Sequence, residues 1–116
     1  MKREIFLDFE TTGLSLNDAV VEAGLVDEAS VPLVNTLVYT HKKITPGAFE
    51  KHGINAEMLR SAPRFVEVKD RILQLCRGVD VVIYNAEFDV KFLPELKNVA
   101  GRILCCMRGY QKIVGR

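Results

Sequence analysis

The chain lacks a long apolar run, a paired set of cysteines and an excess of charge of either sign. No stretch of about 18 consecutive apolar residues occurs, so we expect no transmembrane helix and no membrane partner. No charged leader with an apolar centre precedes the first strand-like segment. The cysteines, Cys76, Cys105 and Cys106, are odd in number and form no C-x-x-C spacing, so we expect reduced thiols. These features predict a soluble, cytoplasmic protein.

The charges nearly cancel. Sixteen basic and fifteen acidic residues leave a formal net charge of +1. So weak a field does not collect a polyanion from a distance, and any nucleic-acid binding has to be local. The stretch from Lys91 onward is less even, because Glu95 is its single acid among several lysines and arginines. We interpret it either as a solvated basic face or as a phosphate-contacting surface.

At 116 residues, 48% of them hydrophobic, the chain fits one compact domain over residues 1–116. Apolar runs separated by short connections predict an antiparallel meander of three strands, over residues 4–9, 19–27 and 33–40. Capping residues and helical periodicity then predict helices over 46–53, 55–59 and 63–78.

The remaining third of the chain returns to a sheet. The β-branched run 79–84 is typical of a central strand that is buried on both faces. We expect a helix over 86–96 that is kinked or ended early by Pro94, a fifth strand over 101–106, and a helical segment over 107–114. The predicted fold is therefore an α/β mixed sheet of about five strands with flanking helices.

The segment Phe6-Leu7-Asp8-Phe9-Glu10 carries two carboxylates two positions apart. Side chains alternate faces along a strand, so Asp8 and Glu10 project together from one side. A pair of like charges is tolerated in water, when one member is protonated, or when a cation lies between them. Only the cation would make the pair chemically active.

A third acid follows the central strand. If the first and fourth strands are parallel neighbours, their carboxyl ends meet at one edge of the sheet, where ligands gather in open α/β sheets. Asp89 lies just beyond that fourth strand. Three carboxylates from two neighbouring elements suit hard divalent cations such as Mg²⁺. Two such ions can activate water and stabilise the leaving oxygen of a phosphodiester.

Three motifs now resemble a known family. Asp-x-Glu-Thr-Thr-Gly at 8–13, Asn-Ala-x-Phe-Asp-x-x-Phe-Leu at 85–93 and the segment 44–54 are similar to motifs of the DEDD superfamily of 3′→5′ exonucleases. That superfamily has a ribonuclease H-like fold, and residues 92–107 look most like its exonuclease X branch. The resemblance implies removal of nucleotides from a single-stranded 3′ end, with DNA favoured over RNA, and two Mg²⁺ or Mn²⁺ ions.

The resemblance also implies roles for particular residues. Asp8, Glu10 and Asp89 would be the catalytic metal ligands. The terminal nucleotide would be held by the residues Thr11, Thr12, Gly13 and Leu14. His52 and Phe88 would line the same pocket, and Asn85 would brace the loop that carries Asp89. A structural alternative stands beside two of these roles: His52 also suits a helix C-terminus, and Phe88 also suits a core.

One departure from the family is large. A third motif, with a fourth acid and a histidine or tyrosine general base, would follow Asp89 and is not found here. The chain therefore resembles the first two thirds of a catalytic domain, truncated at its C-terminal side. The alternative is an inactive or truncated exonuclease-like domain that binds nucleic acid or a protein partner. An uncovered sheet face would also favour self-association or a place in a larger polymerase or repair assembly.

Overall fold

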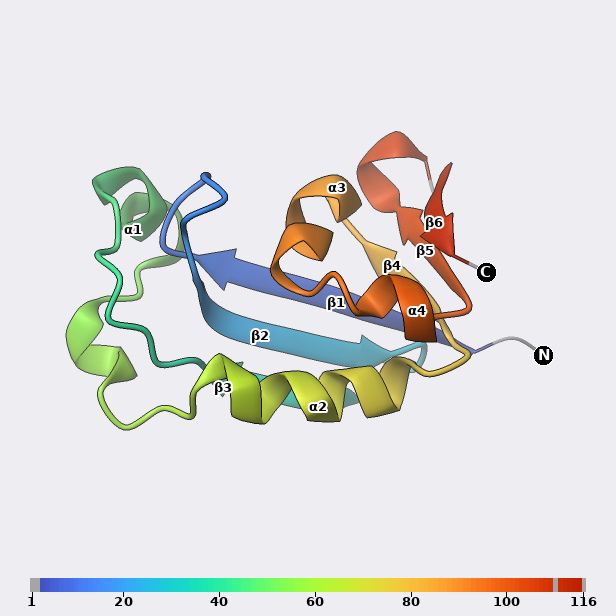
Figure 1. The fold of residues 1–116 in the computed structure, drawn as a ribbon, viewed down its shortest axis with the longest axis horizontal. Coiled ribbons are helices and arrows are strands. Elements are labelled where there is room, and N and C mark those ends of the chain that lie inside the picture. The colour runs from blue at the N-terminus through green and yellow to red at the C-terminus, as the bar shows by residue number, and fades with distance from the viewer. Residues whose placement is uncertain (1–2, 110, 116) are drawn as a thin grey trace.

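A computed structural model describes residues 3–109 and 111–115 and places a mixed sheet at the centre of the molecule (Figure 1). Within these residues the sheet has six strands in the order β3-β2-β1-β4-β5-β6. The strands are β1 (Glu4–Thr11), β2 (Val20–Asp27), β3 (Pro32–Leu37), β4 (Asp80–Ile83), β5 (Arg102–Cys105) and β6 (Gln111–Gly115). Between β3 and β4 lie α1 (Pro46–His52), the 3-10 helix η1 (Ala56–Leu59) and α2 (Phe65–Cys76).

The pairing of the strands confirms the predicted meander and crossover. β1 pairs antiparallel with β2, and β2 pairs antiparallel with β3. β4 returns parallel to β1, with Leu7 opposite Ile83 in the last pair, and β5 continues parallel to β4. β1 extends past that last pair to Thr11, so its carboxyl end has a free edge on the β4 side.

Alternation along β1 divides the sheet into two different faces. Ile5, Leu7 and Phe9 are buried in a core that they share with Val68 and Ile72 of α2. The α4 helix (Leu96–Val99) contributes Leu96 to the same core, so α2 and α4 cover one face of the sheet. Asp8 and Glu10 lie on the opposite face of β1 and are less buried than their neighbours.

Caps and turns place α1 beside the carboxyl end of β1. The Thr45 side chain accepts a hydrogen bond from Ala48 N at 3.1 Å, with Pro46 in the first turn. Gly53 ends α1 in the left-handed region, at φ 70°, where glycine carries no steric penalty. Figure 1 shows α1 at the end of the molecule toward which β1 points.

The segment 107–114 was wrongly predicted to be helical. Cys106–Arg108 forms a single 3-10 turn, η3, and Gly109 ends it with φ 68°. The chain then reverses, and β6 pairs antiparallel with β5, giving a sixth strand where about five were expected. Local sequence did not reveal this because the free edge of β5, which supplies the pairing groups, forms only in the folded sheet. Tyr110 and Arg116 lie outside the described residues.

The helix expected over 86–96 is broken, as the position of Pro94 suggested. It consists of α3 (Ala86–Asp89), the 3-10 turn η2 (Val90–Phe92) and, after Pro94, α4. The three cysteines are free thiols, with Cys76 and Cys105 buried, as expected. In the part of the chain that the structure describes, no helix is long and apolar enough to span a membrane.

Candidate active site

A pocket of about 620 Å³ opens at the carboxyl end of β1, between α1 and α3. It is lined by all three acids singled out from the sequence, Asp8, Glu10 and Asp89. Asp8 and Glu10 come from β1, and Asp89 comes from α3, directly after the neighbouring parallel strand β4. The crossover therefore brings acids about 80 positions apart to one place.

A hydrogen bond joins β1 directly to α3. Phe9 N lies past the last β1–β4 pair and donates to Asp89 Oδ2 at 3.3 Å. Phe9 stands between Asp8 and Glu10, so this contact ties the third carboxylate to the strand that carries the other two. Asp89 itself is buried, with 6% of its surface exposed.

Crowding and desolvation disfavour the ionised form of each acid. Burial raises the pKa of Asp89 to about 7, the repulsion of Asp8 and Glu10 adds to the rise, and the Phe9 N–H opposes it. Desolvation by the pocket walls, followed by repulsion from Asp8, raises the pKa of Glu10. Desolvation also raises the pKa of Asp8, although its side chain is open to solvent on one side. The positive charge near the three carboxylates is therefore too small to offset their desolvation and mutual repulsion.

Lys51 supplies positive charge to the pocket. It lies in the last turn of α1 and is the one lysine or arginine among the described lining residues. Its ammonium group lowers the pKa of Asp8, Glu10 and Asp89 alike. Sequence reasoning missed Lys51. The only signal was its position directly before His52, and one lysine on a short helix does not reveal which way it points.

His52 links α1 to the end of β1 and lines the pocket. Its Nδ1 accepts from Ile54 N at 3.0 Å, so the proton lies on Nε2, which donates to Thr11 O at 2.9 Å. Both ring nitrogens are therefore used to hold the backbone. The pocket-lining interpretation and the structural one apply to this residue together.

The turn after β1 is closed by a compact polar network. Thr12 is fully buried, and its hydroxyl donates to Asp18 Oδ1 at 2.7 Å. Ser15 also binds Asp18 through its N–H and its hydroxyl, each at 2.9 Å. A Cβ on Gly13 would lie 2.6 Å from Asp18 Oδ2, so this position needs glycine. Asp18 is a second residue that the motif alone did not indicate.

The residues expected to hold a nucleotide divide into two groups. Thr11, Gly13 and Leu14 line the pocket, and Leu14 is exposed over 85% of its surface at the tip of the turn. Thr12 is not among the lining residues, because its side chain turns inward to Asp18. Its contact with a nucleotide stays a prediction.

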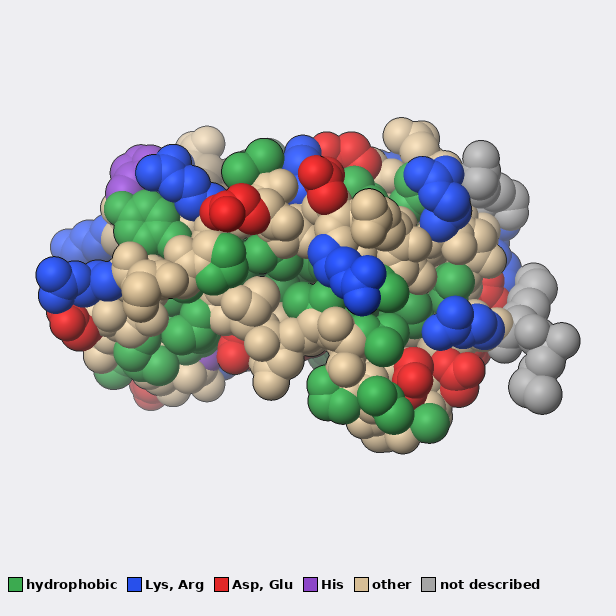
Figure 2. Space-filling model, turned by 90° about the horizontal axis from the view of Figure 1, so that it is seen from below, with side chains coloured by type: hydrophobic (Ala, Val, Ile, Leu, Met, Phe, Trp, Pro, Cys, Tyr) green, Lys and Arg blue, Asp and Glu red, His purple; other side chains and the backbone are tan. Residues whose placement is uncertain are grey.

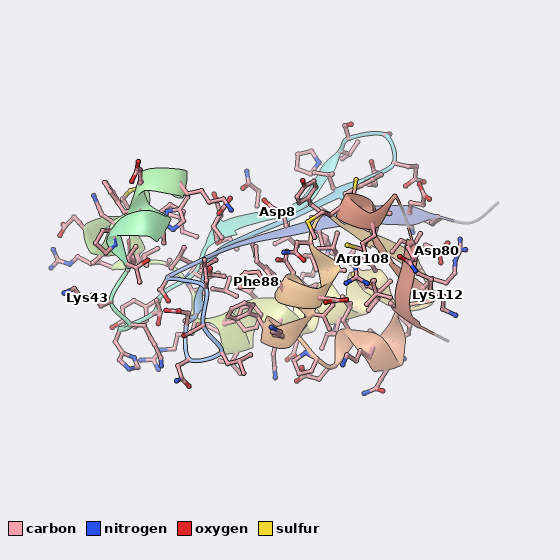
Figure 3. The ribbon with its side chains drawn as sticks, turned by 90° about the horizontal axis from the view of Figure 1, so that it is seen from above. Asp8, Lys43, Asp80, Phe88, Arg108 and Lys112 are labelled. Atoms are coloured by element: carbon pink, nitrogen blue, oxygen red, sulfur yellow. The ribbon has the colours of Figure 1, made fainter. Side chains whose placement is uncertain are left out.

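The α3 side of the pocket carries aromatic and amide groups. Tyr84, Asn85 and Phe88 line it, and Tyr84 is 67% exposed. Figure 3 shows Phe88 and Asp8 near the middle of the long axis of the molecule. The backbone carbonyl of Asn85 accepts from Asp89 N at 3.1 Å, and the bracing role expected of Asn85 stays a prediction. Asn85 is the N-cap residue of α3, and its side chain makes no capping hydrogen bond.

The chemistry of the donor set fits a hard divalent cation, because all three acids are carboxylates. A cation would also relieve their mutual repulsion and hold Asp89 ionised. Among the described residues, however, no group of three or more acidic, histidine or cysteine side chains is arranged so that it could hold a metal ion as it stands. The acids share one pocket without forming a closed ligand shell.

The comparisons with known proteins place this chain in a family. Residues 5–102 match the exonuclease family model named for RNase T. An uncharacterized exonuclease, CP81, of Escherichia phage 186 is 36% identical over 97 residues, which cover 84% of this chain and 50% of that protein. The DNA polymerase III epsilon subunit of Escherichia coli K12 is 36% identical over 101 residues, or 78% of this chain and 42% of that protein.

A solved structure agrees. Exonuclease X in complex with 5′ overhanging duplex DNA has a TM-score of 0.67 and 27% identity, over 90% of this chain and 60% of that one. The chain thus spans half or less of these two curated relatives. The match over residues 5–102 nevertheless includes Asp8, Glu10 and Asp89. This chain belongs to the RNase T-type exonuclease family of the DEDD superfamily.

Proposed function

We propose that this chain is a metal-dependent 3′→5′ exonuclease, which hydrolyses the phosphodiester bond at the 3′ end of a nucleic acid. The observation that carries the proposal is the meeting of Asp8, Glu10 and Asp89 in one pocket, with Phe9 N bound to Asp89 Oδ2. Family membership supports it independently.

Asp8, Glu10 and Asp89 are the proposed ligands of two Mg²⁺ or Mn²⁺ ions. When bound, the ions would activate a water molecule and stabilise the leaving oxygen. The chain itself desolvates the three carboxylates, and Lys51 offers the pocket a cation that can contact a phosphate oxygen. His52 keeps α1 against the end of β1, so that Lys51 stays beside the acids.

The 3′-terminal nucleotide is proposed to lie against the turn after β1. Thr11, Gly13 and Leu14 present backbone and apolar surface there, and Phe88 faces the pocket from α3. Thr12 supports the turn from behind, through Asp18. DNA is favoured over RNA, because the similar exonuclease X structure is a complex with duplex DNA and the epsilon relative is a DNA polymerase subunit. The epsilon relative is a polymerase subunit, which supports a polymerase or repair assembly as partner.

The test is release of mononucleotides from single strands labelled at either end. We expect Mg²⁺-dependent shortening from the 3′ end, and at least about a hundredfold loss in Asp8→Ala and Asp89→Ala. Asp70→Ala is the matched control, because Asp70 is an exposed acid of α2 outside the pocket. Equal rates in Asp8→Ala and Asp70→Ala would refute the assignment.

A second candidate is an inactive exonuclease-like domain that binds nucleic acid or a protein. The specific observation behind it is that the acids, as they lie in the described residues, do not form a ready metal-binding group. Titration with Mn²⁺ separates the two candidates. Two tight sites with turnover favour the enzyme, whereas single-strand binding without turnover favours the inactive domain. Size-exclusion chromatography tests the proposed self-association, and a clean monomer would contradict it.

A further inference from the structure

A second pocket, of about 490 Å³, lies on the other side of α1. It is formed by the segment 39–44, by Phe49 of α1, and by residues around η1. No acidic residue is among its described lining residues. The lining instead carries the basic side chains His41, Lys42, Lys43 and Arg60. Figure 2 shows blue and purple basic side chains at this end of the molecule, with red acidic side chains beside them.

Two aromatic rings lie among these basic groups. Phe49 lines the pocket and is 46% exposed, although most large apolar side chains of the chain are buried. Tyr39 is already stacked, with the Arg64 guanidinium 5.6 Å from its ring centroid. Phe49 is therefore the ring that is open to a ligand. An exposed ring beside cations is a combination that binds single-stranded nucleic acid.

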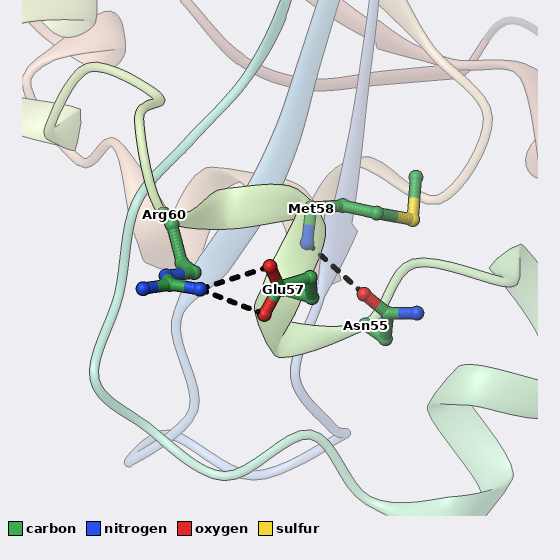
Figure 4. Close-up of polar contacts among 4 residues, drawn as sticks. All are labelled: Asn55, Glu57, Met58 and Arg60. Atoms are coloured by element: carbon green, nitrogen blue, oxygen red, sulfur yellow. Dashed lines mark hydrogen bonds and ion pairs between the residues drawn. The ribbon is translucent and has the colours of Figure 1, made fainter.

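The cations of the pocket are not equally available. Arg60 forms an ion pair of 2.9 Å with Glu57 on the outside of η1, where Asn55 caps the turn by accepting from Met58 N (Figure 4). Among the described residues, Lys42 and Lys43 form no such pair, and both are exposed. In Figure 3 Lys43 lies at one end of the molecule, far from Arg108 and Lys112. The two lysines can therefore meet a phosphate without breaking an ion pair, although the charge of Lys42 also lowers the pKa of Asp18.

The basic residues after Lys91, by contrast, are partly neutralised. Arg102 pairs with Asp80 at 2.6 Å, and Arg108 pairs with Glu87. These pairs favour the solvated-face interpretation for that stretch. Two of the basic side chains after Lys91 are therefore held in ion pairs, whereas Lys42 and Lys43 at the second pocket are in none.

The second pocket and the candidate active site share one helix. Phe49 faces the second pocket, whereas Ala48, Lys51 and His52 of the same helix line the active-site pocket. A helix with its side chains is only about 10–12 Å across. One flexible strand can therefore occupy both pockets by passing over α1.

We propose that the second pocket binds the same single strand a few nucleotides upstream of its 3′ end, with Lys42 and Lys43 on phosphates and a base stacked on Phe49. The direction of the strand rests on the proposed function. The binding itself does not, because it needs neither metal nor hydrolysis. Its consequence is that long strands are held more tightly than short ones.

The first experiment measures the affinity of the chain for labelled single strands in EDTA, where hydrolysis is blocked. Strands of about 12 and about 3 nucleotides compare a ligand that reaches both pockets with one that fills a single pocket. In the double variant Lys42→Ala/Lys43→Ala, we expect the affinity advantage of the long strand to shrink about five- to tenfold. The salt slope for the long strand should fall by about 1.4, because each phosphate contact to a single strand contributes about 0.7.

Lys97→Ala/Lys112→Ala is the matched control, because it also removes two exposed lysines and neither lines a pocket. It should leave the length dependence unchanged. An equal effect of the two double variants would show a response to net charge only, and would overturn the proposal.

The second experiment uses the absence of tryptophan from this chain. Phe49→Trp places a single indole in the second pocket, and Leu14→Trp places one at the active-site pocket. The long strand should quench the Phe49→Trp emission, and the short strand should quench it much less. An unchanged Phe49→Trp signal while anisotropy shows the long strand bound would overturn the proposal. So would the absence of any strand binding.

The result is independent of the exonuclease assignment. Quenching at Phe49→Trp without nucleotide release in Mg²⁺ would support the second pocket and refute the enzyme. Nucleotide release without quenching of the Phe49→Trp emission would support the enzyme and refute the second pocket.

Discussion

The backbone N–H of Phe9 donates to the carboxylate of Asp89 across 80 residues of sequence. The bond exists because β1 runs past the end of β4, which leaves Phe9 N without a strand partner at the point where α3 begins. The bond holds the buried Asp89 carboxylate close to Asp8 and Glu10. The pKa of Asp89 therefore depends on how β1 and α3 pack together.

The raised pKa of Asp89 predicts a pH dependence of stability in metal-free protein. The folded pKa of about 7 lies above the ordinary value of 3.8, so the folded state binds this proton more tightly than the unfolded state. The stabilisation is present below pH 3.8 and is lost as pH rises to about 7, with a slope of at most about 1.4 kcal/mol per pH unit.

Urea unfolding in EDTA at several pH values checks this. Asp89→Asn keeps an oxygen that can accept from Phe9 N but does not titrate, so its stability should be flatter over the same range. The same variant should lose nuclease activity. A wild-type stability that rises from pH 4 to 7 faster than that of Asp89→Asn would contradict the prediction.

Removing the charge of Lys51 should act in opposite directions on the metal and on the substrate. In Lys51→Met the cation site loses a neighbouring positive charge, so Mg²⁺ should bind about two- to fivefold more tightly, as expected for a partly exposed charge. The substrate loses a phosphate contact, so KM should rise. Calorimetry and steady-state kinetics measure the two effects, with Lys97→Met as control. A parallel loss of both affinities would indicate that Lys51 has only a structural role.

Gly13→Ala should destabilise the turn after β1. The added Cβ would meet Asp18 Oδ2 at 2.6 Å, and Asp18 can move away only by losing bonds to Thr12 and Ser15. We expect a loss of about 1–2 kcal/mol in the free energy of unfolding, together with weaker substrate binding. Gly47→Ala is the comparison, since a Cβ there has no neighbour within 4 Å and alanine favours the helix. Equal stabilities of the two variants would contradict the steric argument.

His52→Asn should separate the two bonds of the imidazole. The shorter asparagine side chain can still accept a hydrogen bond from Ile54 N. It does not reach Thr11 O, to which His52 Nε2 donates at 2.9 Å. We expect a loss of about 1 kcal/mol in stability, and a higher KM because α1 moves relative to β1. Denaturation and kinetics test this. An unaltered KM in a destabilised protein would mean that the link stabilises the fold without positioning the pocket.

Local sequence was informative where the physics is local. Alternation along β1 placed Asp8 and Glu10 on one face, and caps at Thr45 and Asn55 started two helices correctly. The segment 107–114 failed because its strand pairs with β5, a partner that no local pattern reveals. Thr12 shows the same limit, because its partner Asp18 turns its side chain away from the pocket.

The sequence by itself determined the family, the three acids and the order of the elements as far as β5, because motifs and periodicity are properties of neighbouring residues. The tertiary structure decided what surrounds those acids. It placed Lys51 beside them, used both nitrogens of His52 for the backbone, and positioned Lys42 and Lys43 behind α1. Burial and electrostatic interaction depend on distances through space, and such distances between remote segments exist only once the sheet has formed.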